Sequence, residues 1–351
     1  MLTARENFYE AVKGGHPDRF VNQFEALCFL SYPGVFHDPM PRPGQENVVN
    51  AWGVTNSFPA GMPGLFPVHT PDKIVIKDIE HWKDYVHAPS LDFPEAEWDM
   101  CRAQFDAVDT KKAYKALGYG PGIFEMCHNL GEISNTLMNL MIYPDEMHEL
   151  IRYLTDYEMH LAELICDKLH PDALLHSDDF GSRTSTFMSP EMFEEFLLEP
   201  YQQIYAYYKS HGVELIIHHS DSYAATLVPS MKKMGIDVWQ GCMTSNNIPQ
   251  LVRENAGTLG FMGSFDGADF DKPDWEPDAL REAVYRVLDA TDPFGCVPCV
   301  AQATPGSVFP GVYQRIADVI DDYNAEKFGH NRAEIADMRL PLQIIAYGVD
   351  Q

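Results

Sequence analysis

Polar side chains that can bind a metal or move a proton follow five consecutive apolar runs of the sequence, where each expected strand ends. If these strands are parallel, their carboxyl ends meet on one face, which is where barrel enzymes place their active sites. A purely structural account would not require such groups at five successive strand ends. The set comprises His176, Asp178, Asp179, His218, His219, Asp221, Gln240, Cys242, Ser264, Asp266, Cys299 and Gln302.

His219 and Asp221 follow an apolar run that we expect to be a strand over residues 214–218. Side chains alternate along a strand, so these two project to the same side. An imidazole and a carboxylate on one side suit a divalent metal such as zinc. Taken alone, however, the pair favours a structural role, as a hydrogen-bonded core histidine beside an aspartate that caps a helix.

Asp178 and Asp179 pair two carboxylates after an expected strand over residues 173–176. Neighbouring residues of a strand face opposite ways, so at most one of them enters a site unless the strand has already turned. One role for that residue is a general acid with a raised pKa. Solvation of a loop or capping of a helix explains the pair equally well.

Cys296 and Cys299 form a lone Cys-x-x-Cys pair. A structural zinc site of this kind needs a second pair, and the chain has none. We therefore expect Cys296 to be a buried thiol, whereas Cys299 lies nearer the end of its strand and remains a candidate site residue.

The elements that must position these groups alternate between strand and helix, which predicts parallel strands with right-handed crossovers. We expect one domain over residues 1–351, an α/β fold of the (β/α)8 TIM-barrel class. A doubly wound sheet is possible, but the glycines of residues 118–122 lack the phosphate-loop spacing and precede an expected strand. The expected strands cover residues 20–24, 122–126, 173–176, 214–218, 237–240, 258–262 and 296–301. The expected helices cover residues 1–15, 144–165, 190–210, 248–255, 277–289 and 312–326, and another helix ends at Met234.

Two segments lie outside this alternation. Residues 31–72 are too rich in proline for regular elements and too aromatic for a disordered linker, so we expect an ordered N-terminal lid. Residues 330–351 form a C-terminal tail whose apolar stretch, residues 340–347, could pack on a second subunit in a homodimer.

Charge and composition exclude several classes of partner. The chain carries 25 Lys and Arg against 52 Asp and Glu, a net charge of −27, which disfavours nucleic acid and anionic membrane surfaces. Its seven cysteines show no regular framework, and the N-terminus resembles neither a signal peptide nor a membrane span. These features predict a cytoplasmic protein with reduced thiols.

Spaced landmarks along the chain resemble the uroporphyrinogen-decarboxylase superfamily, and their order and spacing carry the resemblance more than any single motif. They are His16-Pro-Asp-Arg-Phe20, Trp52-Gly53, His176-Ser-Asp-Asp-Phe-Gly181, Met188-Ser-Pro-Glu-Met-Phe193, Ile217-His-His-Ser-Asp221, Met234-Gly-Ile-Asp-Val238 and Thr304-Pro305.

The resemblance implies a (β/α)8 barrel with one of two activities, cofactor-free decarboxylation of uroporphyrinogen or corrinoid-linked methyl transfer, often with zinc. In the methyltransferases the zinc ligands resemble His-x-Cys at one strand end and a cysteine on the last strand. His219 and Cys299 match two of these ligands, and Asp221 stands where the other cysteine would be. An oxygen ligand would keep zinc Lewis-acidic and suited to polarising an ether oxygen.

A decarboxylase of this superfamily must bind a substrate with many carboxylates. The region that would supply arginines, residues 20–28, contains none, and Arg19 and Arg42 are the only arginines between residues 6 and 100. With so acidic a chain, binding such a polyanion is electrostatically adverse.

We therefore expect the methyltransferase component of an O-demethylase, which moves a methyl group from a small methoxylated donor, expected to be aromatic, to a corrinoid. The chain has no Asp-x-His-x-x-Gly, the motif that resembles a cobalt-ligating loop, so the corrinoid should arrive on a separate protein. A non-catalytic binder of a small ligand is the alternative from another class. The expected catalytic residues are Asp178, Asp179 and His219, and the expected metal ligands are His219, Asp221 and Cys299. The expected substrate-binding residues are Trp52, Phe66, His176, Gln240, Ser264 and Asp266. The two aromatic residues among them could equally serve as packing across the barrel mouth.

Overall fold

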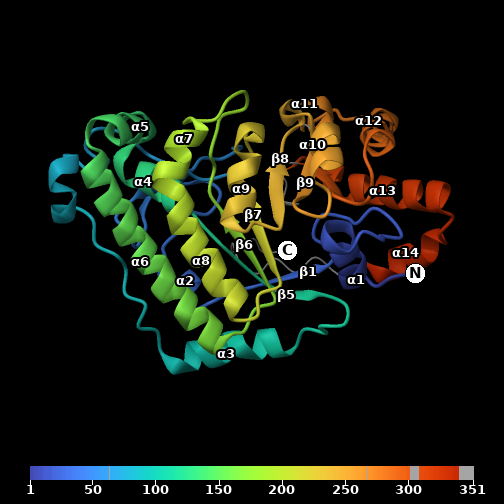
Figure 1. Ribbon diagram of the computed structural model, residues 1–351, viewed down its shortest axis with the longest axis horizontal. Coiled ribbons are helices and arrows are strands. Elements are labelled where there is room, and N and C mark those ends of the chain that lie inside the picture. The colour runs from blue at the N-terminus through green and yellow to red at the C-terminus, as the bar shows by residue number, and fades with distance from the viewer. Residues whose placement is uncertain (63, 266, 301–307, 340–351) are drawn as a thin grey trace.

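The computed structural model describes residues 1–62, 64–265, 267–300 and 308–339. A curled sheet of seven parallel strands forms its centre, in the order β1-β5-β6-β7-β8-β9-β10, with helices around it (Figure 1). This confirms the α/β class and a barrel-like sheet, but the described residues supply seven strands of the main sheet where eight were predicted. The strands are β1 (Leu27–Leu30), β5 (Tyr114–Tyr119), β6 (Ala173–Ser177), β7 (Leu215–His219), β8 (Val238–Cys242), β9 (Gly260–Phe265) and β10 (Cys296–Val300).

Alternation along each strand divides the core into two layers. On β7, Leu215 and Ile217 belong to the apolar cluster inside the curled sheet, whereas Ile216 belongs to the cluster between sheet and helices. His219 continues the inward series and His218 the outward series. The direction of each polar side chain at a strand end therefore follows from the apolar residues before it.

Amphipathic helices cover the outside of the sheet. The predicted apolar stripe of α6 (Pro144–Lys168) is buried, because its residues recur at helical spacing. The predicted start at Ser189 and Pro190 and the predicted cap at Gly235 are confirmed. The other helices are α1 (Ala4–Tyr9), α2 (Gly34–His37), α3 (Glu95–Asp106), α4 (Ile123–Gly131), α5 (Ile133–Ile142), α7 (Pro190–Phe193), α8 (Glu199–Ser210), α9 (Val228–Met234), α10 (Ile248–Asn255), α11 (Gly267–Phe270), α12 (Pro277–Ala290), α13 (Val312–Phe328) and α14 (Arg332–Met338), with π-helical turns at Glu10–Gly14 and Glu194–Leu198 and 3-10 turns at Ile79–Asp84, Ala225–Leu227 and Thr244–Asn246.

The two edge strands, β1 and β10, do not pair with each other in the described part of the chain. The segment before β1 is instead tied to α13, which follows β10. Asn324 binds both the backbone N–H and the carbonyl of Phe20 at 2.9 Å, and the Asn22 amide donates to Asp321 at 2.9 Å. These contacts define what we call the seam, where the first and last parts of the chain meet.

The predicted strand over residues 122–126 is wrong. These residues begin helix α4, and the strand, β5, lies just before them. A short apolar run fits either period, so pattern alone does not separate the two structures. The predicted strand over residues 20–24 is likewise irregular, and β1 begins at Leu27.

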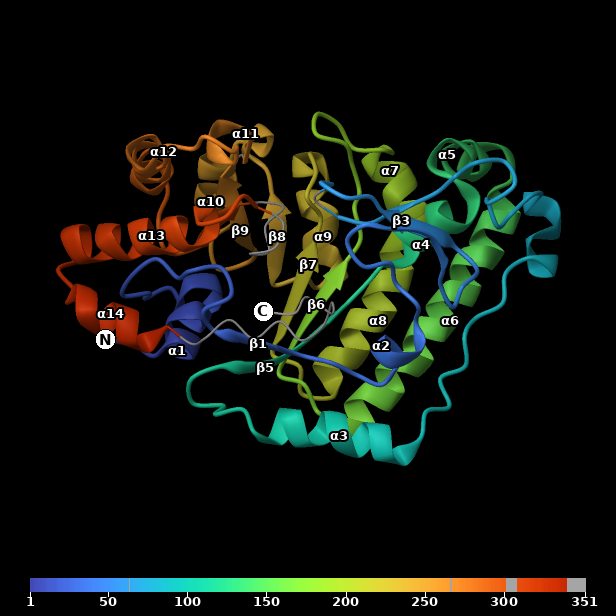
Figure 2. The same ribbon diagram turned by 180° about the vertical axis from the view of Figure 1, so that it is seen from behind.

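Residues 31–72 contain regular structure despite their prolines. Strands β2 (Gln45–Val49), β3 (Thr55–Phe58) and β4 (Phe66–Pro67) pair as a small antiparallel sheet, which lies near α4 (Figure 2). The chain then follows α4, where the His69 ring contacts the Asn129 carbonyl at 3.1 Å. The prolines stand mostly between the strands, where the loss of an N–H costs no ladder hydrogen bond.

The predicted tail begins with α14, which is held to α13 by ion pairs from Arg332 and Arg339 to Asp318 and Asp321. The apolar residues 340–347 lie outside the described residues. Among the described helices, none combines the length and the apolar character that crossing a membrane would require.

Candidate metal centre

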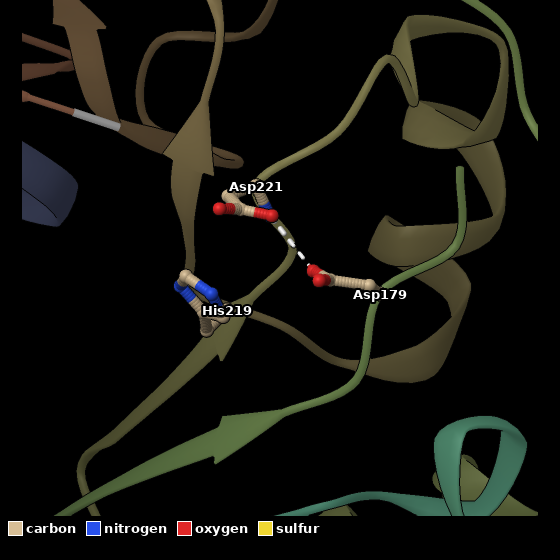
Figure 3. A group of neighbouring side chains, drawn as sticks. All are labelled: Asp179, His219 and Asp221. Carbon is tan, nitrogen blue, oxygen red and sulfur yellow. Dashed lines mark hydrogen bonds between the residues drawn. The ribbon is translucent and has the colours of Figure 1, made fainter. Parts of the chain in front are cut away.

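Asp179, His219 and Asp221 come together at the carboxyl ends of two neighbouring strands. Asp179 follows β6, His219 ends β7, and Asp221 lies in the loop beyond it (Figure 3). One potential ligand atom from each residue lies within 4.8 Å of the other two. All three side chains are partly exposed, so a ligand could reach them.

Hydrogen bonds hold this group in place. A ring nitrogen of His219, Nδ1, contacts the Gln240 side-chain oxygen from β8, so Nδ1 donates there and Nε2 remains for a ligand. The backbone N–H of Asp221 donates to the Asp179 carboxylate at 2.8 Å, which fixes one carboxylate beside the other.

Burial, together with the nearby negative charge of Asp179, raises the pKa of Asp221 to about 7. Two carboxylates so placed repel each other unless a proton or a cation lies between them. The electrostatics of the group therefore favour a bound cation.

Glu125 adds a carboxylate that the sequence prediction missed. It lies in the first turn of α4 and accepts a hydrogen bond from the backbone N–H of Asp179, while burial and the charges of Asp179, Asp178 and Asp221 raise its pKa well above its usual range. The missed signal was the Gly-Pro-Gly before it, which ends β5 and starts a helix. The erroneous strand over residues 122–126 concealed this.

The donor set fits a divalent metal. Zinc binds histidine nitrogen and carboxylate oxygen at about 2.0–2.2 Å, so tetrahedral ligand atoms lie about 3.4 Å apart. Small side-chain rotations would bring atoms within 4.8 Å to that spacing. His219 would supply nitrogen, and Asp179 and Asp221 would supply oxygen.

Cys299 does not belong to this group of described residues. On β10 it pairs with Ser264 of β9, and β8 and β9 separate it from β7. Its side chain packs in the apolar cluster inside the sheet, where burial raises the pKa of the thiol well above its usual value. Among the described residues, the third potential ligand beside His219 and Asp221 is therefore Asp179, and not Cys299 as predicted.

The sequence model of the uroporphyrinogen decarboxylase (URO-D) family matches residues 117–295, slightly more than half of the chain. The chain belongs to the URO-D family. The matched residues include the second half of β5, the strands β6 to β9 and all members of the group around His219.

A solved structure similar in fold is a methyltransferase from Methanosarcina mazei. The two share 14% sequence identity with a TM-score of 0.61, over 92% of this chain and 99% of the other. No curated protein matches the chain significantly. At this identity the likeness concerns the fold.

Two predicted site residues of this URO-D family member face the helices instead of the barrel mouth. Asp178 is fully buried and accepts hydrogen bonds from the N–H groups of Phe124 and Glu125 at 2.9 and 2.7 Å and from the Tyr201 hydroxyl. It therefore caps α4, and burial raises its pKa to about 7. His176 is also fully buried and contacts the Tyr205 hydroxyl at 3.0 Å.

The remaining predicted residues are dispersed. Ser264 is buried, and its hydroxyl lies 3.7 Å from the Cys296 thiol. Trp52 packs edge to face on Tyr157 of α6, and Phe66 is exposed on β4. Gln240 contacts His219 and so orients a candidate ligand. Asp266 lies outside the described residues.

Gly241 of β8 makes a testable contact with this centre. It has a φ of 93°, and a Cβ built on it would lie 2.9 Å from the Asp221 backbone nitrogen. We expect Gly241→Ala to destabilise the fold by about 1–3 kcal/mol and to weaken metal binding, because it displaces the Asp221 backbone. Urea unfolding and zinc titration measure these effects, and Gly212→Ala, with a φ of 99° and nothing within 4 Å of its Cβ, is the matched control for strain. Equal effects of the two substitutions on zinc binding would contradict the prediction.

Proposed function

We propose that the protein is a methyltransferase that moves a methyl group from a small methoxylated donor to the cobalt(I) of a separate corrinoid protein. The observation that carries the proposal is the group of Asp179, His219 and Asp221 at the strand ends. The methyltransferase of similar fold supports the reaction class.

Asp179, His219 and Asp221 would hold zinc, which when bound would act as a Lewis acid toward the leaving oxygen of the donor. The Gln240 side chain keeps the His219 ring oriented, and the Asp221 N–H keeps Asp179 in place. Glu125, whose pKa is raised, would carry a proton toward the same oxygen. The curled sheet thus orients the donor and activates its leaving group.

A uroporphyrinogen decarboxylase is a poorer candidate because the site is anionic. Arg19 is fully buried and already pairs with Asp18 and Glu25 at 2.8 and 3.0 Å, so it does not face a substrate. Carboxylates at the strand ends would repel a polycarboxylate substrate.

The aromatic character of the donor is a separate part of the proposal. Trp52 packs edge to face on Tyr157 and is partly exposed, and its stacking on an aromatic donor stays a prediction. A panel of methoxylated arenes and methoxylated alkanes distinguishes the two donor classes.

We expect the wild-type protein to bind one zinc ion and to transfer methyl from a member of this panel to a reduced corrinoid protein. His219→Ala should lower methyl transfer by at least 100-fold and abolish stoichiometric zinc, because it removes the only nitrogen ligand of the proposed set. Metal analysis and a single-turnover methyl-transfer assay provide the two readouts.

Three variants make this experiment specific. Asp179→Asn should weaken zinc binding, whereas Cys299→Ser should leave it unchanged, and His81→Ala, at an exposed histidine, should retain full activity. Activity that survives both metal removal and His219→Ala would refute the metal mechanism. If Cys299→Ser lost zinc and Asp179→Asn kept it, Cys299 would be the third ligand, as the sequence predicted.

A further inference from the structure

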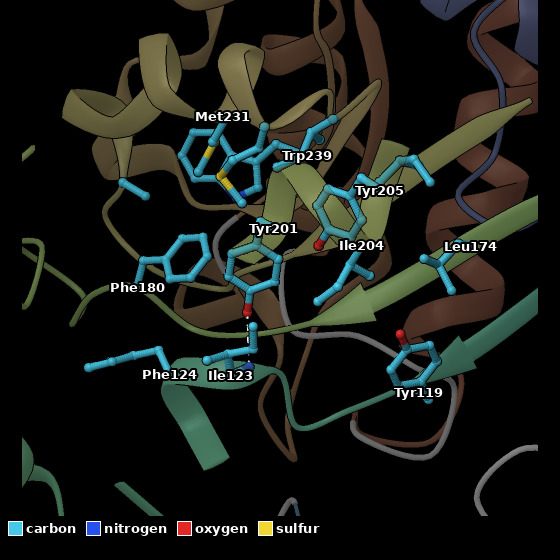
Figure 4. Close-up of a cluster of buried hydrophobic side chains, with 14 of the residues drawn as sticks. Tyr119, Ile123, Phe124, Leu174, Phe180, Tyr201, Ile204, Tyr205, Met231 and Trp239 are labelled. Atoms are coloured by element: carbon cyan, nitrogen blue, oxygen red, sulfur yellow. Dashed lines mark hydrogen bonds between the residues drawn. The ribbon is translucent and has the colours of Figure 1, made fainter. Parts of the chain in front are cut away.

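A chain of buried polar side chains lies behind the candidate centre, between the strands β6 and β7 and the helices α6 and α8. It contains His176 and His218 from the strands, Tyr205 from α8 and Glu158 from α6. Three of these side chains are wholly inaccessible to solvent, and Glu158 is buried. Figure 4 shows Tyr205 and its neighbour Tyr201 within the apolar core that surrounds the chain.

The carbonyl of Asp178 sets the direction of this chain. A carbonyl only accepts, so His218, whose Nε2 lies 3.1 Å from it, must donate there. In a neutral ring the other nitrogen, Nδ1, then accepts, and the Tyr205 hydroxyl at 2.7 Å must donate to it. Because that hydroxyl has a single hydrogen, it accepts from its second neighbour, the Nδ1–H of His176 at 3.0 Å.

Glu158 is the last member of this chain of side chains. With its hydrogen on Nδ1, neutral His176 presents a bare Nε2, and a Glu158 carboxyl oxygen lies 3.3 Å from it. Both atoms are buried, and neither has a hydrogen bond in this part of the structure, which spans residues 64–265 without a gap. A carboxylate facing a bare nitrogen would repel it, whereas a carboxylic acid would donate to it.

We propose that Glu158 is a neutral carboxylic acid that heads a one-way hydrogen-bond chain through His176, Tyr205 and His218 to the Asp178 carbonyl, and that this chain positions Asp179 and His219. The positioning role rests on the proposed function, whereas the neutral Glu158 and the hydrogen-bond chain do not. Asp179 and His219 each directly follow a residue that the chain holds.

The surroundings favour the neutral form over an ion pair. Burial raises the pKa of Glu158, and the charge of Asp178 raises it further; burial also lowers the pKa of His176 to about 3. The other titratable groups that face Glu158 are the phenols of Tyr119, Tyr157, Tyr201, Tyr205 and Tyr208. A charged pair here would be surrounded by aromatic rings and would gain little solvation.

Nitrogen-15 NMR of the full-length protein labelled in histidine tests the chain itself, without metal. We expect His176 to be neutral with its hydrogen on Nδ1 and His218 to be neutral with its hydrogen on Nε2, with assignments from single His→Gln variants. Two opposite tautomers in one protein are a specific signature. A doubly protonated His176 or His218, or the reverse tautomers, would overturn the proposal.

Zinc affinity tests the positioning role. Tyr205→Phe should weaken zinc binding by roughly 10- to 100-fold, as loss of outer-shell support does at other metal sites. Tyr208→Phe removes a hydroxyl from the same helix, equally buried but outside the chain, and should change affinity less than twofold. Glu158→Gln keeps a donor toward His176 and should retain affinity, whereas Glu158→Leu should lose it.

The outcomes separate the two proposals. Equal affinity in Tyr205→Phe and wild type, or equal losses in Tyr205→Phe and Tyr208→Phe, would overturn the positioning role. A wild-type protein that binds no zinc would overturn the metal centre and with it the positioning role, and the tautomers would still decide whether the hydrogen-bond chain exists.

Discussion

Replacing Asp178 by alanine should lower the free energy of unfolding by about 3–5 kcal/mol. The substitution leaves the N–H groups of Phe124 and Glu125 and the Tyr201 hydroxyl without their acceptor, in a place that water does not reach. Each buried donor that loses its partner costs about 1–3 kcal/mol. Urea unfolding at pH 8 measures the loss.

Two milder changes at the same place calibrate this prediction. Asp178→Asn keeps an acceptor oxygen and Tyr201→Phe removes a single donor, so both should cost less than Asp178→Ala. Asp106→Ala, at an exposed helical position, should shift stability by no more than about 0.5 kcal/mol. A loss below about 1 kcal/mol for Asp178→Ala would show that α4 does not depend on this cap.

Replacing Glu158 by glutamine should make the protein progressively more stable than the wild type as the pH rises. Burial raises the pKa of Glu158, so the folded wild type holds a proton that the unfolded chain releases above about pH 4.5. Wherever the folded state binds one more proton, the free energy of unfolding falls by about 1.4 kcal/mol per pH unit. Glutamine needs no proton and removes this loss.

The difference in unfolding free energy, variant minus wild type, should therefore grow between pH 6 and pH 8, with an upper limit of about 2.7 kcal/mol for one proton. Histidine titration cancels in this difference, because His176 is present in both proteins. Glu149→Gln, at an exposed glutamate of the same helix that pairs with Lys83, should give a difference that does not change between pH 6 and pH 8. A constant difference for Glu158→Gln would mean that Glu158 is ionised in the fold.

The sequence predicted well those features that repeat along the chain. The apolar stripe of α6 and the alternation of β7 were read correctly, since each extends over several periods. The rule that neighbouring strand residues face opposite ways also holds at Asp178 and Asp179, one of which caps α4 while the other joins His219.

The wrong predictions have a common physical cause. Each concerns a feature that depends on contacts between segments distant in the sequence. Residues 122–126 form a helix whose first turn Asp178 caps from another strand, and no local pattern reveals that partner. Cys299 and Ser264 lie one residue before the ends of β10 and β9, yet the order of the strands places them away from β7. Glu125 became visible only when α4 was in place.

The seam determines when the barrel can be completed during synthesis. Asn22 and Phe20 find their partners, Asp321 and Asn324, about 300 positions later in the chain. Until those residues leave the ribosome, the segment before the edge strand β1 lacks these partners, and its backbone groups are open to pairing with other chains. The nascent protein therefore depends on protection of its N-terminal edge throughout translation, and truncations that remove α13 should aggregate even though every residue of the candidate metal centre is present.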